Sequence, residues 1–176
     1  PVFSILGSTI SASDVSKQVS GINFKGTNSE NNVFNVTFER CHNSADKNNE
    51  NERALAIDIH HAAEQVTIEF CRFNLCGGLR SNENNFRYTI YDEGKDTTIN
   101  SCTFEGGQDT MNAPAIKVRS YGTHTITNCY IINPKCEYRG AVSYLSEGYD
   151  GTLEGFETIK GDEENENFVF QNITIE

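Results

Sequence analysis

Four polar residues of this 176-residue chain could line a binding groove for an acidic sugar: Asp58, His60, Lys117 and Arg119. They stand in or directly after short runs of alternating apolar and polar residues, and in a strand the side chains at i and i+2 share a face. One outward line of this face is expected to hold Asn23, Asp58, Thr89, Lys117 and Ser143. No two outward carboxylates stack at the spacing that glycoside hydrolysis requires. The four residues are therefore ligand-binding candidates without a catalytic pair.

Other patterns that could indicate chemistry have simpler explanations. His60-His61 looks like a metal-ligand pair, but neighbouring strand residues point to opposite faces. The acidic residues within 162–166 lack the spacing of a calcium loop, and acidic runs are usually solvated. The chain contains no nucleophile elbow, P-loop or dinucleotide-binding glycine motif. We therefore expect no catalytic residue, no metal site and no cofactor, which favours a protein that is not an enzyme.

A hexad that recurs six times organises the whole chain. Its copies are ILGSTI, VFNVTF, IEFCRF, INSCTF, ITNCYI and FQNITI. Three positions are apolar or small in nearly every copy, and we expect them to point into a core. The first column holds Ile5, Val33, Ile68, Ile99, Ile126 and Phe170. The second holds Ser8, Val36, Cys71, Cys102, Cys129 and Ile173, and the third holds Ile10, Phe38, Phe73, Phe104, Ile131 and Ile175. Second-column residues are 28, 35, 31, 27 and 44 residues apart, which is typical of a repeat architecture.

A bend is predicted between the first two columns. That position holds Gly7, Asn35, Phe70, Ser101, Asn128 and Asn172. Gly and Asn are the residues that best tolerate a left-handed backbone. Two of the asparagines open N-glycosylation sequons, Asn35-Val36-Thr37 and Asn172-Ile173-Thr174. An inward ladder of asparagine side chains would compete with glycan attachment, and the sequence leaves both alternatives open.

A further strand precedes each hexad, because short runs with period-two alternation occur at 21–24, 56–59, 87–90, 115–118 and 141–144. The distance to the following hexad is 11 residues in three units: Ile22 to Val33, Ile57 to Ile68 and Tyr88 to Ile99. No window sustains helical periodicity. We predict an all-β fold, a right-handed parallel β-helix of about six coils with three short strands each. It forms a single domain over residues 1–176.

One long segment, residues 146–167, interrupts the last coil between its first and second strands. It is acidic, and we expect a projecting loop that is either a solvated flap or a binding element. Neither end of the chain shows a capping helix or a polar end repeat. We therefore expect head-to-tail stacking on copies of the chain, or continuation by adjoining coils of a longer one.

Five of the six cysteines fall into two groups, and the sixth, Cys136, has no equivalent partner one coil earlier. Three occupy the second column and are expected to be buried thiols: Cys71, Cys102 and Cys129. Cys41 and Cys76 each stand five residues after a second-column residue, so they should lie one coil apart. That separation is within the roughly 4.4–6.8 Å between Cα atoms that a disulfide needs, and we predict that they are bonded. A disulfide indicates an oxidising, extracellular compartment.

Charge and hydropathy limit the range of partners. The formal net charge of −11 disfavours nucleic acid, whose phosphates would be repelled. No run approaches the roughly 18 apolar residues of a membrane span. The expected partners are copies of the chain, adjoining coils and, as a further possibility, glycans.

The coil plan resembles the pectate-lyase-like superfamily of right-handed β-helices. Gly140-Ala141-Val142 before a strand and the Thr-Ile-x-x-Cys-x-Phe box after one resemble degraded polymorphic-membrane-protein repeats. Such repeats occur in bacterial autotransporter adhesins and in large surface proteins of some protists. The resemblance implies surface display, adhesion or a rod-like spacer. Our interpretation is a non-catalytic, extracellular or cell-surface glycoprotein, an adhesin segment or filament building block. The alternative is a polysaccharide lyase or hydrolase, or a carbohydrate-binding β-helix.

Overall fold

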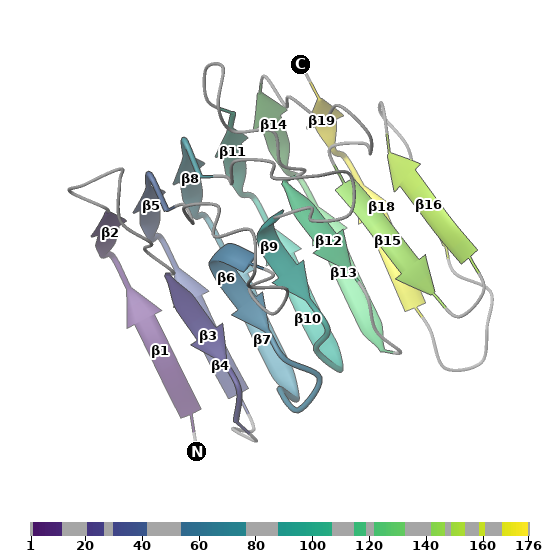
Figure 1. The fold of residues 1–176 in the computed structure, drawn as a ribbon, viewed down its shortest axis with the longest axis horizontal. Coiled ribbons are helices and arrows are strands. Elements are labelled where there is room, and N and C mark those ends of the chain that lie inside the picture. The colour runs from purple at the N-terminus through teal and green to yellow at the C-terminus, as the bar shows by residue number, and fades with distance from the viewer. Residues whose placement is uncertain are drawn as a thin grey trace, which may run out of the picture.

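Three β-sheets stack around one apolar core in the computed structural model of this chain (Figure 1). The structure describes residues 2–11, 21–26, 30–41, 54–76, 88–106, 115–118, 122–132, 142–146, 149–153, 159–160 and 167–175. These ranges contain strands and no helix, and hence no helix that could cross a membrane. The predicted all-β parallel β-helix is confirmed.

Each sheet collects equivalent strands from successive turns of the chain. Sheet A contains β1 (Val2–Leu6), β4 (Glu30–Phe34), β7 (Gln65–Glu69), β10 (Asp96–Asn100), β13 (Thr123–Thr127), β18 (Asn167–Gln171) and β17 (Ile159–Lys160). Sheet B contains β2 (Thr9–Ser11), β5 (Thr37–Glu39), β8 (Arg72–Asn74), β11 (Thr103–Glu105), β14 (Tyr130–Ile132) and β19 (Thr174–Ile175). Sheet C contains β3 (Ile22–Phe24), β6 (Ala54–Ile59), β9 (Tyr88–Asp92), β12 (Ile116–Val118), β15 (Val142–Ser146) and β16 (Tyr149–Leu153).

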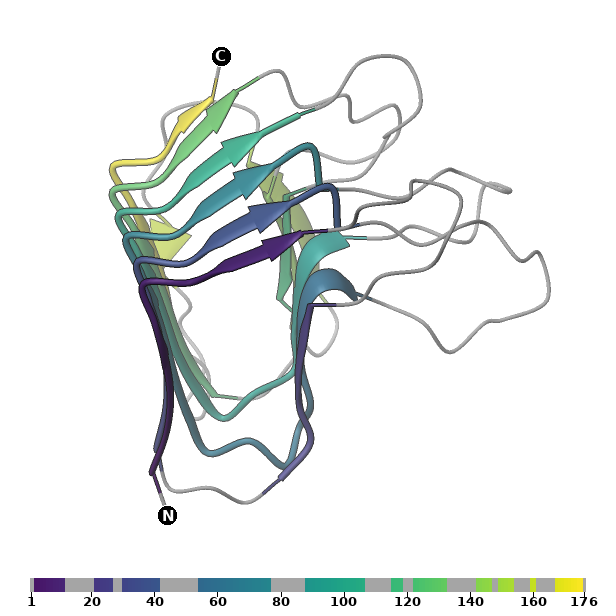
Figure 2. The same ribbon diagram turned by 90° about the vertical axis from the view of Figure 1, so that its left-hand side faces the viewer.

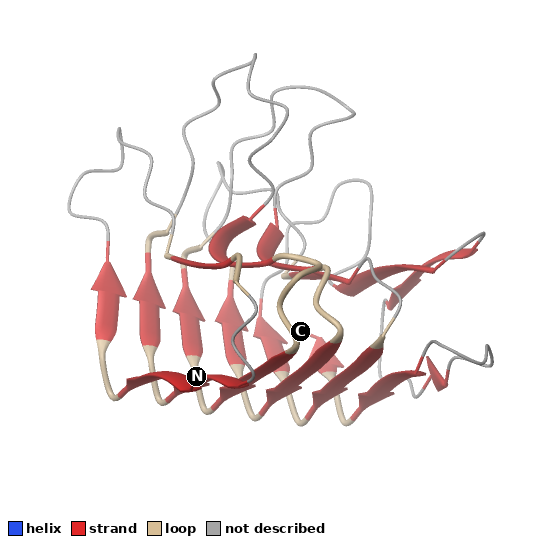
Figure 3. Cartoon of the chain, turned by 90° about the horizontal axis from the view of Figure 1, so that it is seen from below, coloured by secondary structure: helices blue, strands red, loops and turns tan. Residues whose placement is uncertain are grey.

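The chain visits the sheets in the order C, A, B, and we number the coils 1 to 6 by their sheet A strands β1, β4, β7, β10, β13 and β18. Figure 2 looks along the stack and shows sheets A and C facing each other, while sheet B leaves sheet A at a sharp corner. The corners of successive coils form a row, which is visible in Figure 3. Equivalent strands pair in parallel and in register from coil to coil.

The predicted inward columns are confirmed in coils 2 to 6, whereas in coil 1, at the edge of the stack, Ile5 and Ile10 are partly buried and Ser8 is exposed. First-column residues pair with one another across all six coils, as Val33 does with Ile68. In the third column the rings of Phe38, Phe73 and Phe104 stack at centroid distances of 4.8 and 4.6 Å and are nearly parallel. Phe73 and Phe104 are 1% and 3% exposed. Identical side chains one coil apart therefore fill the core by stacking on each other.

The bend column is also confirmed, because all six of its residues have φ between 53° and 57°. The turned peptide keeps its place in the hydrogen-bonded ladder: the Asn35 N–H donates to the Glu69 carbonyl and the Phe70 N–H to the Asn100 carbonyl, at 3.0 and 3.1 Å. Arg40 and Leu75 adopt the same left-handed conformation directly after the sheet B strands. The sequence gives no Gly or Asn signal at those two positions, and this second bend was not predicted.

The predicted register is wrong by two residues in β9. Ile57 pairs with Ile90 instead of Tyr88, after an irregularity in β6 between Ala54 and Ile57. Ile90 lies nine residues before its first-column residue Ile99, whereas Ile57 lies eleven before Ile68, so the connection from β9 to β10 is two residues shorter than the one from β6 to β7. The outward line of sheet C therefore runs Asn23, Asp58, Tyr91, Lys117 and Ser143. Thr89 is not part of it, and its hydroxyl donates to the Cys76 carbonyl at 3.2 Å.

The last coil also differs from expectation. Within the range 146–167, β16 pairs antiparallel with β15 at the edge of sheet C, and β17 pairs antiparallel with β18 at the edge of sheet A. An antiparallel strand can follow a short connection, whereas a parallel one needs a full turn of the coil. β16 and β17 are therefore the outermost strands of sheets C and A at this end. Residues 147–148, 154–158 and 161–166 lie outside the described ranges.

Candidate functional site

The four ligand-binding candidates do not form one cluster. Asp58 and Lys117 share the outward line of sheet C, but Tyr91 stands between them, so they are two strand spacings or about 10 Å apart. Asp58 accepts a hydrogen bond from the Asn23 amide at 3.2 Å. Tyr91 and Lys117 are 5% and 4% exposed. This part of the outward face is covered, and it offers no open groove with an accessible lysine.

His60 lies at the end of β6, and Arg119 lies outside the described residues. His60 opens a turn, because the Ala63 N–H donates to its carbonyl at 2.8 Å. The ring centroids of His60 and His61 are 3.9 Å apart. The prediction that the two rings point to opposite faces is wrong, since it assumed strand geometry that ends at Ile59.

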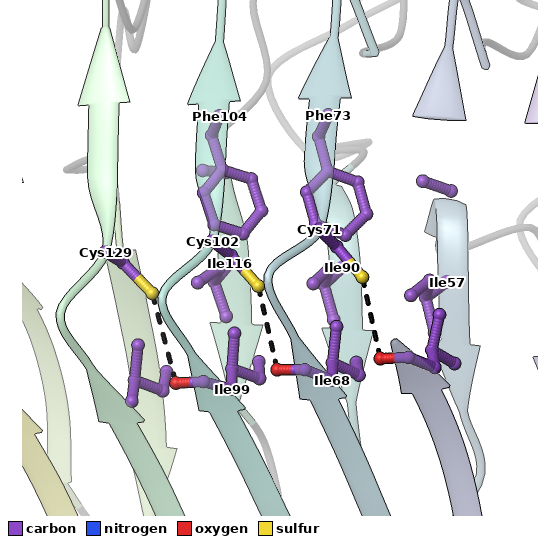
Figure 4. Close-up of a cluster of buried hydrophobic side chains, with 14 of the residues drawn as sticks. Ile57, Ile68, Cys71, Phe73, Ile90, Ile99, Cys102, Phe104, Ile116 and Cys129 are labelled. Atoms are coloured by element: carbon purple, nitrogen blue, oxygen red, sulfur yellow. Dashed lines mark hydrogen bonds between the residues drawn. The ribbon is translucent and has the colours of Figure 1, made fainter. Parts of the chain in front are cut away.

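The second-column cysteines form a row of buried thiols along the core. Figure 4 shows Cys71, Cys102 and Cys129 directed at carbonyl oxygens one coil earlier, those of Val33, Ile68 and Ile99. These sulfur–oxygen distances are 3.5, 3.6 and 3.9 Å. Hydrogen bonds to Cys129 and Cys71, together with burial, raise the pKa of Cys102 far above its ordinary range. This row is a structural element of the core.

Cys41 and Cys76 lie one coil apart after β5 and β8, and both are free thiols in this structure. Cys76 directs its sulfur at the Phe38 carbonyl, 3.5 Å away, and Cys41 directs its sulfur at the Ile10 carbonyl, 3.8 Å away. The hydrogen bond between the two thiols lowers the pKa of Cys41 and, with burial, raises that of Cys76. The predicted disulfide is not formed here. The two cysteines do hold equivalent positions one coil apart, as that prediction assumed.

Polar side chains form a ladder along the bend between sheets A and B. Asn100 donates to Glu69 at 3.2 Å and accepts from Asn128 at 2.9 Å. Asn172 continues the row by donating to Asn128 at 3.0 Å. Asn128 and Asn172 are exposed, so of the two alternatives left open by the sequence, the inward asparagine ladder is wrong. The left-handed bend turns these side chains to the surface, where they tie coils 3 to 6 together.

The same bend is apolar in coils 1 to 3. Leu6, Phe34 and Phe70 are 62%, 43% and 53% exposed. Leu6 and Phe34 are register partners, and the rings of Phe34 and Phe70 meet edge-on with centroids 5.3 Å apart. We call these three residues the bend patch. Exposed apolar clusters of this kind often mark binding sites, and the sequence analysis did not identify this one.

A buried polar cluster was also missed. Asp92 occupies an inward position, because its register partners are Ile59 and Val118. Its Oδ2 lies 2.8 Å from His124 Nδ1, and its Oδ1 accepts from the Thr97 hydroxyl at 3.0 Å. The Gly94 N–H also donates to Oδ1, at 2.8 Å. Asp92 and His124 are 0% exposed, so the cluster is sealed within the core.

The cluster is arranged for structure rather than for catalysis. A hydrolytic triad runs from a nucleophile through a histidine to a carboxylate. Here the hydroxyl of Thr97 and the ring of His124 both converge on the carboxylate of Asp92. A Cβ at Gly94 would lie 2.9 Å from the Thr97 hydroxyl, which explains why glycine stands there. Since Asp92 is in coil 4 and His124 in coil 5, the cluster fixes one coil on the next.

Neither the arrangement of possible metal ligands nor comparison with known proteins assigns a function to this chain. Within the described part of the chain, no group of three or more His, Cys, Asp or Glu residues is placed to hold a metal ion. No protein-family model, curated protein or solved structure matches this chain. The assignment of the fold therefore depends on the pairing of its strands.

Proposed function

We propose that this protein is a non-catalytic, extracellular or cell-surface scaffold, a stiff rod of coils that serves as an adhesin segment or filament building block. The observation that carries the proposal is the regularity of the contacts between coils. Backbone ladders, stacked phenylalanines, thiol-to-carbonyl contacts and surface amides each repeat from one coil to the next. A structure of this kind gains stability with each added coil, because each repeat is stabilised by its neighbours.

The edge formed by β1, β2 and β3 supports a role in assembly. Its inward residues Ile5, Ile10 and Ile22 are only partly buried, whereas their partners one coil on are fully buried. This edge has the register and the apolar surface to accept a further coil, from a copy of this chain or from an adjoining stretch of polypeptide. At the other end β16 occupies the edge of sheet C and β17 occupies the edge of sheet A. Growth by addition of coils is therefore proposed at the β1 edge.

Substitution of Ser4 tests assembly at this edge. The Gly7 N–H donates to the Phe34 carbonyl in coil 2, so by alternation the N–H of Ser4 points to the free edge. Ser4→Pro removes that donor without touching the β1–β4 ladder, and Ser4→Ala is the matched control. In sedimentation at micromolar concentration we expect the wild type and Ser4→Ala to associate and Ser4→Pro to remain monomeric. A wild-type monomer at all concentrations would count against assembly of copies.

A glycan panel separates the scaffold from its alternatives. Incubation with acidic and neutral polysaccharides is expected to give neither turnover nor retention for a scaffold. Turnover would identify a lyase or hydrolase, and retention without turnover a carbohydrate-binding module. The covered Lys117 and the occupied Asp58 carboxylate favour the first result.

A further inference from the structure

The bend patch has an unusual position for exposed aromatic rings. It lies on a strongly acidic domain, with Phe70 in the bend column and Leu6 and Phe34 directly before it, and that column carries amides and serine in the later coils. Phe70 adopts φ 54°, a conformation that is strained for a bulky residue. Solvent contact opposes exposed phenylalanine rings here, and a group that covers them would remove that cost.

Asn35 is the bend residue of coil 2, the middle one of the three coils that contribute to the bend patch. It follows Phe34 directly, and its equivalents one coil away on either side are Gly7 and Phe70. Gly7 has no side chain, so on that side nothing obstructs a bulky group. Asn35 is exposed, and its N–H is already used in the ladder. Thr37, two residues later, completes its sequon from the first position of β5.

The second sequon lies in different surroundings. The Asn172 amide donates to Asn128 at the end of the surface ladder. No such bond involves the Asn35 amide within the described part of the chain. The nitrogen that a glycan would occupy is thus engaged at one sequon and available at the other.

We propose that Asn35 carries an N-linked glycan whose first sugars pack over Leu6, Phe34 and Phe70. The Asn35 amide nitrogen forms a bond to the anomeric carbon of a lipid-pyrophosphate-linked oligosaccharide. The bond from that carbon to the pyrophosphate oxygen breaks, the lipid pyrophosphate leaves with the bonding electron pair, and one amide proton is lost. No oxidation or reduction occurs. The proposal rests on the extracellular location put forward above.

The chemistry of the patch suits a sugar. The faces of a pyranose carry electropositive C–H groups, and aromatic rings present an electronegative face to them. Successive coils are about 4.8 Å apart, so a sugar attached at Asn35 is within reach of both rings. Covering the patch removes exposed apolar surface and adds hydrated groups around it.

The test compares variants that keep or remove the sequon without changing Asn35. Thr37→Ser keeps it and Thr37→Ala removes it, and all chains carry Thr174→Ala so that the second sequon is absent. Each is secreted from a glycosylating eukaryotic host and also made unglycosylated in bacteria, which measures the effect of the substitution itself. Mass spectrometry of the secreted Thr37→Ser chain is expected to find Asn35 occupied.

A second background tests whether the glycan covers the patch. Phe34→Gln with Phe70→Asn removes both rings without creating a further sequon, and Asn is well tolerated at the left-handed bend. With the rings present, we expect the glycan to raise Tm by about 2–4 °C relative to the unglycosylated control. Without the rings, we expect a rise of less than about 1 °C. An unoccupied Asn35, or an equal rise in both backgrounds, would overturn the proposal. Occupancy in a secreting host is independent of filament assembly, so failure of the Ser4 test would leave this result unaffected.

Discussion

Strands β10 and β13 are tied together by polar side chains at both ends, and the two sets of contacts differ in burial. Near the start of the strands, Thr97 and His124 converge on Asp92 inside the core. At the far end, Asn100 accepts from Thr127 and Asn128 at the surface, at 3.1 and 2.9 Å. Both sets join coil 4 to coil 5 with similar distances. The comparison therefore isolates what burial does to a polar contact.

Burial makes the first set far more sensitive to loss of a partner. A group that loses its partner in the core keeps the full cost of desolvation, whereas a group at the surface binds water instead. The Asp92 cluster should therefore fix the register between coils strongly, while the amide ladder contributes modestly. The predictions below test this difference in order of decreasing effect.

The largest effect is expected for Asp92→Ala. It leaves the Gly94 N–H, the Thr97 hydroxyl and His124 Nδ1 without their common acceptor inside the core. We expect the free energy of unfolding to fall by about 3–5 kcal/mol, measured by urea denaturation. Asp96→Ala is the matched control, because Asp96 is exposed at the start of β10, and should change stability by less than about 0.5 kcal/mol. Equal losses for both variants would refute a special role for the cluster.

Thr97→Val should have an intermediate effect. The substitution keeps the shape of the side chain and removes one of three donors to Asp92. We expect a loss of about 1–3 kcal/mol in the same denaturation experiment. The corresponding change at the outward neighbour, Thr98→Val, should be within about 0.5 kcal/mol. A neutral Thr97→Val would mean that the hydroxyl adds nothing to the other two donors.

The columns and the bend were predictable because their signals are local. Period-two alternation fixes which residues face the core, and the left-handed conformation at Asn35 or Asn128 follows from residue type. The register of β9 was not predictable in this way. It depends on the connection from β9 to β10, which is two residues shorter than the equivalent connection from β6 to β7, and only pairing with the neighbouring coils reveals this.

The buried cluster could have been found from the sequence with one further step. Thr97 and His124 stand two residues before the first-column residues Ile99 and Ile126, which places them on the inward face. Asp92 was not assigned because it lies two residues beyond the predicted run 87–90, although alternation from Ile90 places it on the same inward face. The bend patch was missed because Phe70 at a bend looks like a core residue until the direction of the left-handed residue is known.

Asn100→Ala should have a smaller effect than either core change. Asn100 is the centre of the surface ladder, with bonds to Glu69, Thr127 and Asn128. Water can replace each of these partners, so we expect a loss of about 0.5–1.5 kcal/mol in urea denaturation. Thr98→Ala, on the same outward face of β10, controls for the loss of a strand-favouring side chain. A loss as large as that of Asp92→Ala would show that burial is not what separates the two networks.

The smallest effect is expected for Asn128→Gly, and a second substitution at this position shows why. Asn128 has φ 54°, which glycine adopts freely and alanine does not. Asn128→Gly removes the amide but preserves the bend, so stability should change by less than about 0.5 kcal/mol. Asn128→Ala removes the same amide and strains the backbone, so it should cost about 1–2 kcal/mol. The difference between the two unfolding free energies measures the bend alone. If both variants lose the same amount, the amide contacts rather than the left-handed backbone decide which residues this column accepts.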